Sequence, residues 1–509
     1  MYRVVFNKYI TIKKGGINMN STKINRFKIY IILLCIFSIA TISGCSNNKY
    51  TSEYSTSAEN TKTTNFNFDN NKGQYYMPNG SAAAENGYYY ITKNSYTSNN
   101  SEPTYGYFIY YYDMTSQTTV PLCSKLECQH NDSNCDAYLL ENECLGHMIW
   151  FYNDRIYMLE RTNENDNLVS YDKEGRNKKN ICILSDNDAV VGFKNSVDNV
   201  ACVNNGSLYY ETYNLKNDFV ELKKVDLKSD SKPQEIGTVP INPNTLSTNA
   251  FRFYPFQDKV YIFENQYVSA SDKTNSIYEY DVNKNNLSSL IEFKYGDISS
   301  PYRGTIYNWN TNMVVDNDGN FYYITELDGD KIPASIGTGY NKTCIINKYN
   351  VLLKTNSELY VLEGTSDKIG NPDSLIINGY DGTYIYFFEY QISSTIKKKS
   401  NLIEDSNNLI VMNTNGIIID KIHFTVNSEY LDSYFKNWAV GSIRFNKIIP
   451  GDRYIMLATT VNAITGIERS DNYMKAYIAS KNFTETEVLA VLDKNQIGTG
   501  THTWIKVKE

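Results

Sequence analysis

Histidine and tryptophan are scarce in this chain, and the short motifs that mark the common enzyme classes are missing. Its 509 residues contain only four His and four Trp. There is no Gly-x-Ser-x-Gly elbow, no His-Glu-x-x-His zinc motif, no phosphate-binding loop and no dinucleotide fingerprint. These absences argue against the enzyme classes that depend on those motifs, and they leave the catalytic residues, if any, unknown.

Basic residues are concentrated at the N-terminus. Residues 1–44 hold seven of the 49 Lys and Arg and none of the 56 Asp and Glu, so the rest of the chain has a formal net charge of −14. The densest basic run, "KKKS" from Lys397 to Ser400, is typical of a solvated turn. Nucleic-acid binding depends on clustered Lys and Arg, so we expect no nucleic-acid partner.

The first 44 residues have the pattern of a secretory signal. Residues 29–42 form a short apolar run after several basic residues, and the run is shorter than the roughly 20 residues of a transmembrane helix. It ends in "ISGC", Ile42 to Cys45, which resembles the lipobox of bacterial lipoproteins. This resemblance implies cleavage before Cys45 and lipidation of its thiol. An uncleaved membrane anchor is the alternative, and either one places the body on the extracytoplasmic face of the cell membrane.

Two further expectations concern the N-terminal region. The segment "KKGGINM", Lys13 to Met19, can be encoded by a purine-rich ribosome-binding sequence before an ATG, so we expect translation to start at Met19. Residues 45–74 are rich in Ser, Thr and Asn and poor in aliphatic residues, which predicts a disordered tether. As a flexible coil, about 30 residues reach roughly 30 Å on average.

From residue 75 to residue 509 one pattern recurs seven times. A turn rich in Asn, Asp or Gly leads into a short strand with β-branched and aromatic residues. The seven units are "ENGYYYIT", "YNDRIYML", "NNGSLYYE", "FQDKVYIF", "NDGNFYYI", "YDGTYIYFF" and "PGDRYIML", which begin at Glu85, Tyr152, Asn204, Phe256, Asn317, Tyr380 and Pro450. A second strand follows each unit. In the first five units this strand ends in a turn that often contains an aromatic residue followed by Asp, and the last two units have only weak versions of this turn, "VMNTNG" and "YIASKN".

Repeated four-stranded units of this kind predict an all-β fold, a β-propeller with seven blades, in one domain. Six or eight blades are also compatible, because "NSELYVLEG" at Asn356 resembles a further strand. The C-terminal "HTWIKVKE" is expected to pair near "GQYYMP" (Gly73 to Pro78) and close the ring. The one expected helix is Ser428 to Val440, with apolar residues on one face. The "DNDGN" run at Asp316 does not fit an EF-hand and predicts a hairpin with positive φ at Gly319.

Cysteines gather in one short segment, "LCSKLECQHNDSNC" from Leu122 to Cys135, with Cys144 shortly after it. Outside the membrane such thiols can form disulfides, and four cysteines allow three pairings. The alternative is a structural zinc site, and idle thiols are a third interpretation. The zinc ligands would be Cys123, Cys128, His130 and Cys135, although the Cys-x-His spacing is cramped. Cys182 and Cys202 are a further candidate disulfide pair.

The full arrangement resembles a set of uncharacterised surface lipoproteins from Gram-positive bacteria. The shared features are the lipobox at Cys45, the polar tether, the "PLCSKLECQHNDSNCDAY" segment and a Tyr-rich, propeller-like body. The resemblance implies location and fold and brings no substrate. The sequence does not decide whether the chain is an enzyme and favours non-catalytic binding of a protein or glycan partner. The alternative is a carbohydrate-active hydrolase or lyase with paired carboxylates in the propeller channel.

Overall fold

The computed structural model describes residues 81–507. The gaps are 98–102, 131–132, 140–143, 163–164, 186–188, 192–200, 215–218, 229, 241–249, 270–271, 295–312, 335–336, 364–373, 391–407, 424–437 and 466–482. The described residues belong to the larger of two compact units, Thr63–Glu509. Cys45, the signal segment and the tether lie outside them. No helix in the described part is both long and apolar enough to cross a membrane.

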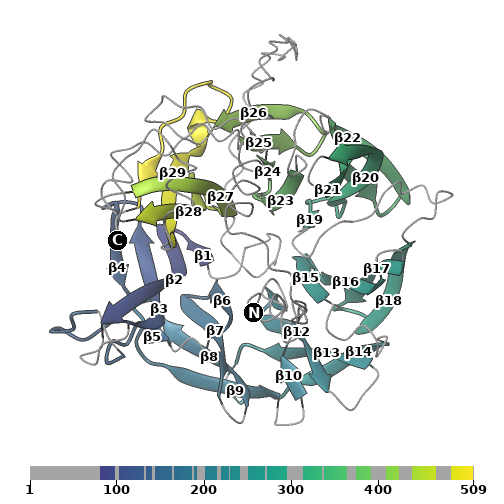
Figure 1. Ribbon diagram of the computed structural model, residues 1–509. Coiled ribbons are helices and arrows are strands. Elements are labelled where there is room, and N and C mark those ends of the chain that lie inside the picture. Colours follow the sequence, from purple (N-terminus) through teal and green to yellow (C-terminus); the bar gives the residue numbers. More distant parts are fainter. Residues whose placement is uncertain are drawn as a thin grey trace, which may run out of the picture. The chain divides into compact units, whose positions relative to one another are not determined.

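The described strands form seven antiparallel sheets (Figure 1). Blade 1 contains β1 (Ser81–Ala84), β2 (Gly87–Thr97), β3 (Pro103–Asp113), β4 (Thr118–Pro121) and β5 (Tyr138–Leu139). Blade 2 contains β6 (Cys144–Tyr152), β7 (Arg155–Arg161), β8 (Asp166–Asp172) and β9 (Lys179–Ser185). Blade 3 contains β10 (Ala189–Val191), β11 (Ala201–Asn204), β12 (Ser207–Asn214), β13 (Phe219–Asp226) and β14 (Gln234–Pro240).

Four more sheets follow in sequence order. Blade 4 contains β15 (Ala250–Phe256), β16 (Lys259–Ser269), β17 (Asp272–Asp281) and β18 (Asn286–Lys294). Blade 5 contains β19 (Val314–Val315), β20 (Phe321–Ala334), β21 (Gly337–Asn350) and β22 (Thr355–Glu363). Blade 6 contains β23 (Ser374–Tyr380), β24 (Tyr384–Tyr390), β25 (Asn408–Asn413) and β26 (Ile418–His423). Blade 7 contains β27 (Trp438–Pro450), β28 (Tyr454–Thr465), β29 (Phe483–Asp493), a 3₁₀ turn (Lys494–Gln496) and β30 (Ile505–Lys506).

The core lies between the blades and runs around the ring. Five clusters of buried side chains cover all seven junctions: one spans blades 7, 1 and 2, one spans blades 4 to 6, and the other three join blades 2 and 3, 3 and 4, and 6 and 7. Tyrosines fill much of this space, and Tyr88, Tyr210, Tyr322 and Tyr386 are each almost completely buried. The structure is therefore a seven-bladed β-propeller, and the prediction of fold and blade number is confirmed.

The seven repeated sequence units coincide with the hairpin turns β1–β2, β6–β7, β11–β12, β15–β16, β19–β20, β23–β24 and β27–β28. In blade 3, Asn204 pairs with Ser207, and the two turn residues Asn205 and Gly206 have φ of 49° and 76°. Positive φ at both central residues defines a type I′ turn, which Asn-Gly favours. The recurrent Asn, Asp and Gly residues are thus the hairpin turns of the propeller.

These turns also connect neighbouring blades through hydrogen bonds. The side-chain amide of Asn205 donates to the carbonyl of Gln257 at 2.8 Å. Gln257 donates in turn to the carbonyl of Asn317 at 3.4 Å, and Asn317 donates to that of Gly382 at 3.1 Å. A residue with an amide side chain at this turn position therefore has two roles. It forms part of the hairpin turn, and its side chain donates a hydrogen bond to the corresponding turn of the next blade.

Side chains close the ring between the first and the last blade. The Tyr88 hydroxyl of β2 donates to the carbonyl of Tyr454 on β28 at 2.8 Å. The C-terminal strand β30 pairs with β29 inside blade 7. The expected pairing partner at residues 73–78 lies outside the described residues. Within the described part, each blade is thus built from one continuous stretch of chain.

The helix predicted from Ser428 to Val440 is wrong at its last three residues, which the structure describes. Trp438, Ala439 and Val440 belong to β27 and pair with Thr465, Ile464 and Ala463 of β28. The rest of the expected helix lies outside the described residues. Pairing with a long neighbouring strand outweighs the helical spacing of a few apolar side chains.

Candidate functional site

The thiol-rich segment is an excursion from the outer edge of blade 1. Strands β4 and β5 both pair with β3, so residues 122–137 leave this edge and return to it. The Leu122 amide donates to the Ile109 carbonyl, and the Ile109 amide donates to the Ala137 carbonyl, both at 2.9 Å. Both ends of the loop are therefore fixed on one residue of β3, and the loop belongs to blade 1 rather than to the connection between blades.

Four soft donor atoms converge inside this loop. The Sγ atoms of Cys123, Cys128 and Cys135 and a ring nitrogen of His130 all lie within 4.8 Å of one another. The His130 Nδ1 lies 3.4 Å from the Cys135 Sγ, and the His130 amide donates to the Cys128 Sγ, also at 3.4 Å. His130 has φ of 51°, and this left-handed backbone closes the short Cys-x-His spacing.

The thiols differ in acidity, and the flanking residues brace the loop. Burial raises the pKa of the Cys135 thiol to about 12. Burial acts in the same direction on Cys123, but hydrogen bonds from the amides of Lys125 and Asp136 lower its pKa below the ordinary value. Lys125 Nζ lies 2.9 Å from the Asp136 carboxylate, which also accepts a bond from Ser124 at 3.1 Å. The residues next to Cys123 and Cys135 therefore tie the two halves of the loop together.

Among the other cysteines named from the sequence, Cys182 and Cys202 have described side chains, and these do not join this cluster. Cys144 is the first residue of β6, where its backbone pairs with Glu160, and its side chain lies outside the described residues. Cys182 and Cys202 are free thiols in the structure. They belong to different core clusters, so the structure does not join the pair that the sequence suggested.

A groove opens beside this loop at the junction of blades 1 and 2. Its volume is about 670 Å³. Its walls come from the β1–β2 turn, strands β3 and β4, the β6–β7 turn and the β8–β9 turn, together with Leu122 and Cys123 at the start of the thiol-rich loop. Hairpin turns from two blades thus meet at one cavity.

Three aromatic rings form the apolar part of the groove. The ring centroid of Tyr89 lies 4.8 Å from that of Tyr111 and 5.3 Å from that of Phe151, and the Tyr89 and Phe151 rings are nearly parallel at 25°. The Tyr89 hydroxyl donates to the carbonyl of Lys173 at 3.0 Å. Tyr111 and Phe151 are only half-buried, so part of each ring is open to a ligand.

Charged groups surround these rings. Glu85, Asp154, Lys173 and Glu174 all line the groove. Burial is the main cause that raises the pKa of Tyr89, and Tyr111, Glu174 and Asp154 raise it further. The Tyr89 phenol is therefore neutral at physiological pH and lies within the electrostatic reach of three carboxylates, those of Glu174, Asp154 and Asp172. Aromatic faces next to hydrogen-bond acceptors suit a ligand with both apolar faces and hydroxyl or amide donors.

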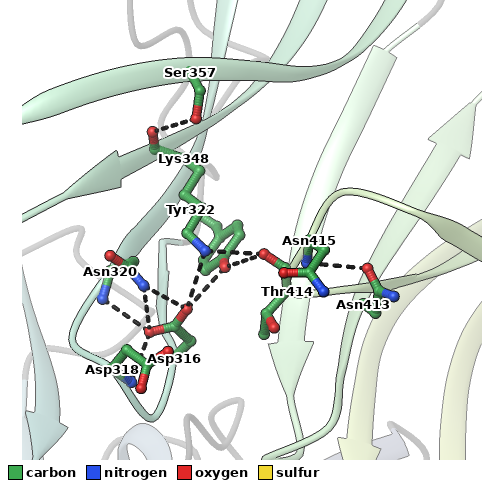
Figure 2. Close-up of polar contacts among 9 residues, drawn as sticks. All are labelled: Asp316, Asp318, Asn320, Tyr322, Lys348, Ser357, Asn413, Thr414 and Asn415. Carbon is green, nitrogen blue, oxygen red and sulfur yellow. Dashed lines mark hydrogen bonds and ion pairs between the residues drawn. The ribbon is translucent and has the colours of Figure 1, made fainter.

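The acidic turn at Asp316 is structural. Its Oδ1 accepts from the amides of Asp318 and Asn320, both at 2.9 Å, and its Oδ2 accepts from the Asn320 side chain at 2.9 Å and the Tyr322 hydroxyl at 2.8 Å (Figure 2). The Tyr322 hydroxyl also reaches the Thr414 carbonyl of blade 6 at 2.9 Å. Gly319 has φ of 80°, as the sequence predicted. Protein donors satisfy this carboxylate, so it holds the turn and links blades 5 and 6.

The fold and these two features define a class, a seven-bladed β-propeller with a thiol-rich loop and an aromatic groove on one blade junction. No protein-family model matches the chain, and no curated protein matches it in sequence. Two solved structures resemble it over most of their own length. They are a protein from Lactobacillus plantarum (11% identity, TM-score 0.36, 78% of this chain and 95% of that chain) and the β-propeller domain of the Trilobed protease from Pyrococcus furiosus (9%, 0.35, 71% and 96%).

A third similar structure belongs to a longer protein. Prolyl oligopeptidase B from Galerina marginata is 11% identical with a TM-score of 0.38, and the match covers 74% of this chain and 45% of that enzyme. The present chain therefore spans less than half the length of the enzyme. At these identities and scores no activity carries over, and the assignment of the propeller rests on the strand order and core described above.

Proposed function

We propose that this chain is a lipid-anchored β-propeller on the extracytoplasmic face of the cell membrane, where it binds a glycan or protein partner without catalysis. We infer that the groove between blades 1 and 2 is the contact surface. One observation carries this proposal: Tyr89, Tyr111 and Phe151 present neighbouring rings in a cavity rimmed by carboxylates. The lipobox-like segment at Cys45 supports the location.

The groove suits recognition for physical reasons. Aromatic rings contribute contact area with little loss of side-chain entropy, and the rings here are already packed against one another. The Tyr89 hydroxyl is held by the Lys173 carbonyl, so the platform is formed before a ligand arrives. A sugar offers apolar faces to the rings and hydroxyl donors to Asp154 and Glu174, which is why we probe a glycan first.

Binding by the full chain in detergent tests this proposal, with purified bacterial cell-wall sacculi and a glycan array as probes. Removal of one ring should weaken binding roughly threefold to tenfold, because an aromatic contact contributes about 0.5–1.5 kcal/mol. The variants are Phe151→Ala and Tyr111→Ala. Leu353→Ala is the control, since Leu353 is an exposed apolar residue on a turn of blade 5. Thermal unfolding checks that each variant is folded. Equal binding by all variants would remove the groove from the proposal.

The alternative function is a carbohydrate-active hydrolase or lyase. It is favoured by the carboxylates of Asp154 and Glu174, which line the groove near the Tyr89 phenol, although they lie at a blade junction and not in the channel where the sequence suggested them. The same glycans, incubated with the protein and examined by mass spectrometry, separate the two functions. Shortened products that disappear in an Asp154→Asn, Glu174→Gln double variant would make the chain an enzyme, and unchanged glycans would leave the binding function.

A further inference from the structure

We propose that the thiol-rich loop of blade 1 binds one zinc ion in a closed structural site, whose ligands are Cys123, Cys128, His130 and Cys135. This inference is independent of the proposed function, because it rests on the geometry of the loop alone. The four ligand atoms converge without help from any residue outside the loop.

The distances are close to those of a tetrahedral zinc site. Zn–S bonds of about 2.3 Å and Zn–N bonds of about 2.0–2.1 Å place neighbouring ligand atoms roughly 3.5–3.8 Å apart. The His130 Nδ1 and the Cys135 Sγ are already 3.4 Å apart, and no pair in the cluster exceeds 4.8 Å. Side-chain movements of about 1 Å therefore suffice to complete the coordination shell.

The donor set favours a metal over a disulfide. A disulfide within the cluster uses two of its thiols, and it leaves the third cysteine and the histidine unbonded among the four converging donors. Three thiolates and an imidazole are soft donors that match Zn²⁺, and four protein ligands leave no open position for catalysis. The backbone amide of His130 donates to the Cys128 Sγ, and a hydrogen bond of this kind stabilises a metal-bound thiolate.

A crosslink inside the loop would also hold its exposed tip in place. The two ends of the loop are anchored by Ile109, and Leu122, Cys135 and Ala137 are buried there. At the described tip, by contrast, Leu126 is fully exposed. A segment that cannot bury an apolar core is commonly held by a metal or by disulfides, and a metal at the four donors would fix the tip to the anchored ends.

Metal content of the intact protein tests the site. The full chain is produced in a Gram-positive host, solubilised in detergent, dialysed against a weak chelator and measured for zinc and for mass under native and denaturing conditions. We expect about one zinc per chain, lost on denaturation. Cys128→Ser and His130→Ala should each reduce the zinc at least tenfold. Cys182→Ser, which removes a half-buried thiol in blade 2, should leave it unchanged.

A second measurement protects the test against variants that do not fold. Replacement of zinc by Co²⁺ in the unaltered protein should produce the thiolate charge-transfer and visible absorption of a tetrahedral, sulfur-rich site. The proposal fails if the unaltered protein contains no zinc and its mass is two hydrogens lower per cysteine pair. It also fails if the protein contains no zinc and all thiols react with an alkylating reagent, or if Cys182→Ser loses zinc as strongly as Cys128→Ser.

Discussion

Replacement of Asp316 by Ala should destabilise the propeller far more than any change to the neighbouring exposed acid. Asp316 is 2% exposed and accepts five hydrogen bonds from four donor groups, which are the amides of Asp318 and Asn320, the Asn320 side chain and the Tyr322 hydroxyl. Removal of the carboxylate leaves these donors facing an apolar methyl group. The Tyr322 hydroxyl can still use the Thr414 carbonyl, and the exposed Asp318 amide can reach water.

Two buried donors then remain without a partner, both on Asn320, which is 4% exposed. Each unsatisfied buried donor costs about 1–3 kcal/mol, so Asp316→Ala should lower the free energy of unfolding by about 2–5 kcal/mol. Tyr322→Phe should lower it by only about 1–2 kcal/mol. The reason is that Asp316 keeps its other donors and the Thr414 carbonyl keeps Lys348 Nζ at 3.0 Å.

Urea unfolding of the full chain, followed by fluorescence, measures these differences from the shift in midpoint at a constant denaturant slope. Asp318→Asn is the matched control, because Asp318 lies in the same turn with its side chain in water, and we expect a change below about 0.5 kcal/mol. If Asp316→Ala resembles this control, or if Tyr322→Phe is the more damaging change, the argument that the carboxylate organises the turn is refuted.

Two predictions concern the anchor and the rim of the groove. Cys45→Ser should move the protein from the membrane fraction to the medium and remove the acyl mass, whereas an unchanged membrane fraction would favour an uncleaved anchor. Partial burial acts to raise the pKa of Asp172, but hydrogen bonds from the Arg176 amide and the Asn177 side chain outweigh it and lower that pKa below its ordinary value. The carboxylate therefore stabilises the β8–β9 turn above about pH 4, and this contribution is lost as the pH falls through the lowered pKa. Hydrogen exchange at the Glu174 and Arg176 amides should accelerate in that range, and no such acceleration should occur in Asp172→Asn.

The propeller was predictable because each blade repeats one local signal. The hairpin turn and the aromatic strand after it depend on neighbouring residues only, so "NNGSLYYE" and "YDGTYIYFF" predict their strands without knowledge of the rest of the chain. The sequence was also compatible with eight blades because "NSELYVLEG" resembled a further strand. In the structure this segment belongs to β22, the outer strand of blade 5. In blade 7 the weak unit "YIASKN" lies outside the described residues, and the turn after β29 follows Asp493.

The candidate sites were less predictable, because they depend on backbone geometry and on contacts between blades. The four residues that we propose as zinc ligands could be named from residue type, but the left-handed backbone at His130 that relieves the cramped spacing has no sequence signal of its own. The groove joins Tyr89 and Tyr111 of blade 1 to Phe151 of blade 2. Phe151 lies two residues before Asn153, where the β6–β7 turn begins. Only the packing of two blades shows that the Phe151 ring faces the other two rings.

Each described blade is one continuous stretch of chain. The ring of seven blades therefore does not depend on which blade comes first in the sequence. Each described sheet is completed by its own strands, and the junction between blades 7 and 1 is held by side chains such as Tyr88 and Val507, much as the other six junctions are. A circular permutant that joins the two ends of the propeller and opens another inter-blade loop would retain the seven sheets as the described residues form them. For the same reason, duplication or loss of one gene segment can add or remove a whole blade without cutting any sheet.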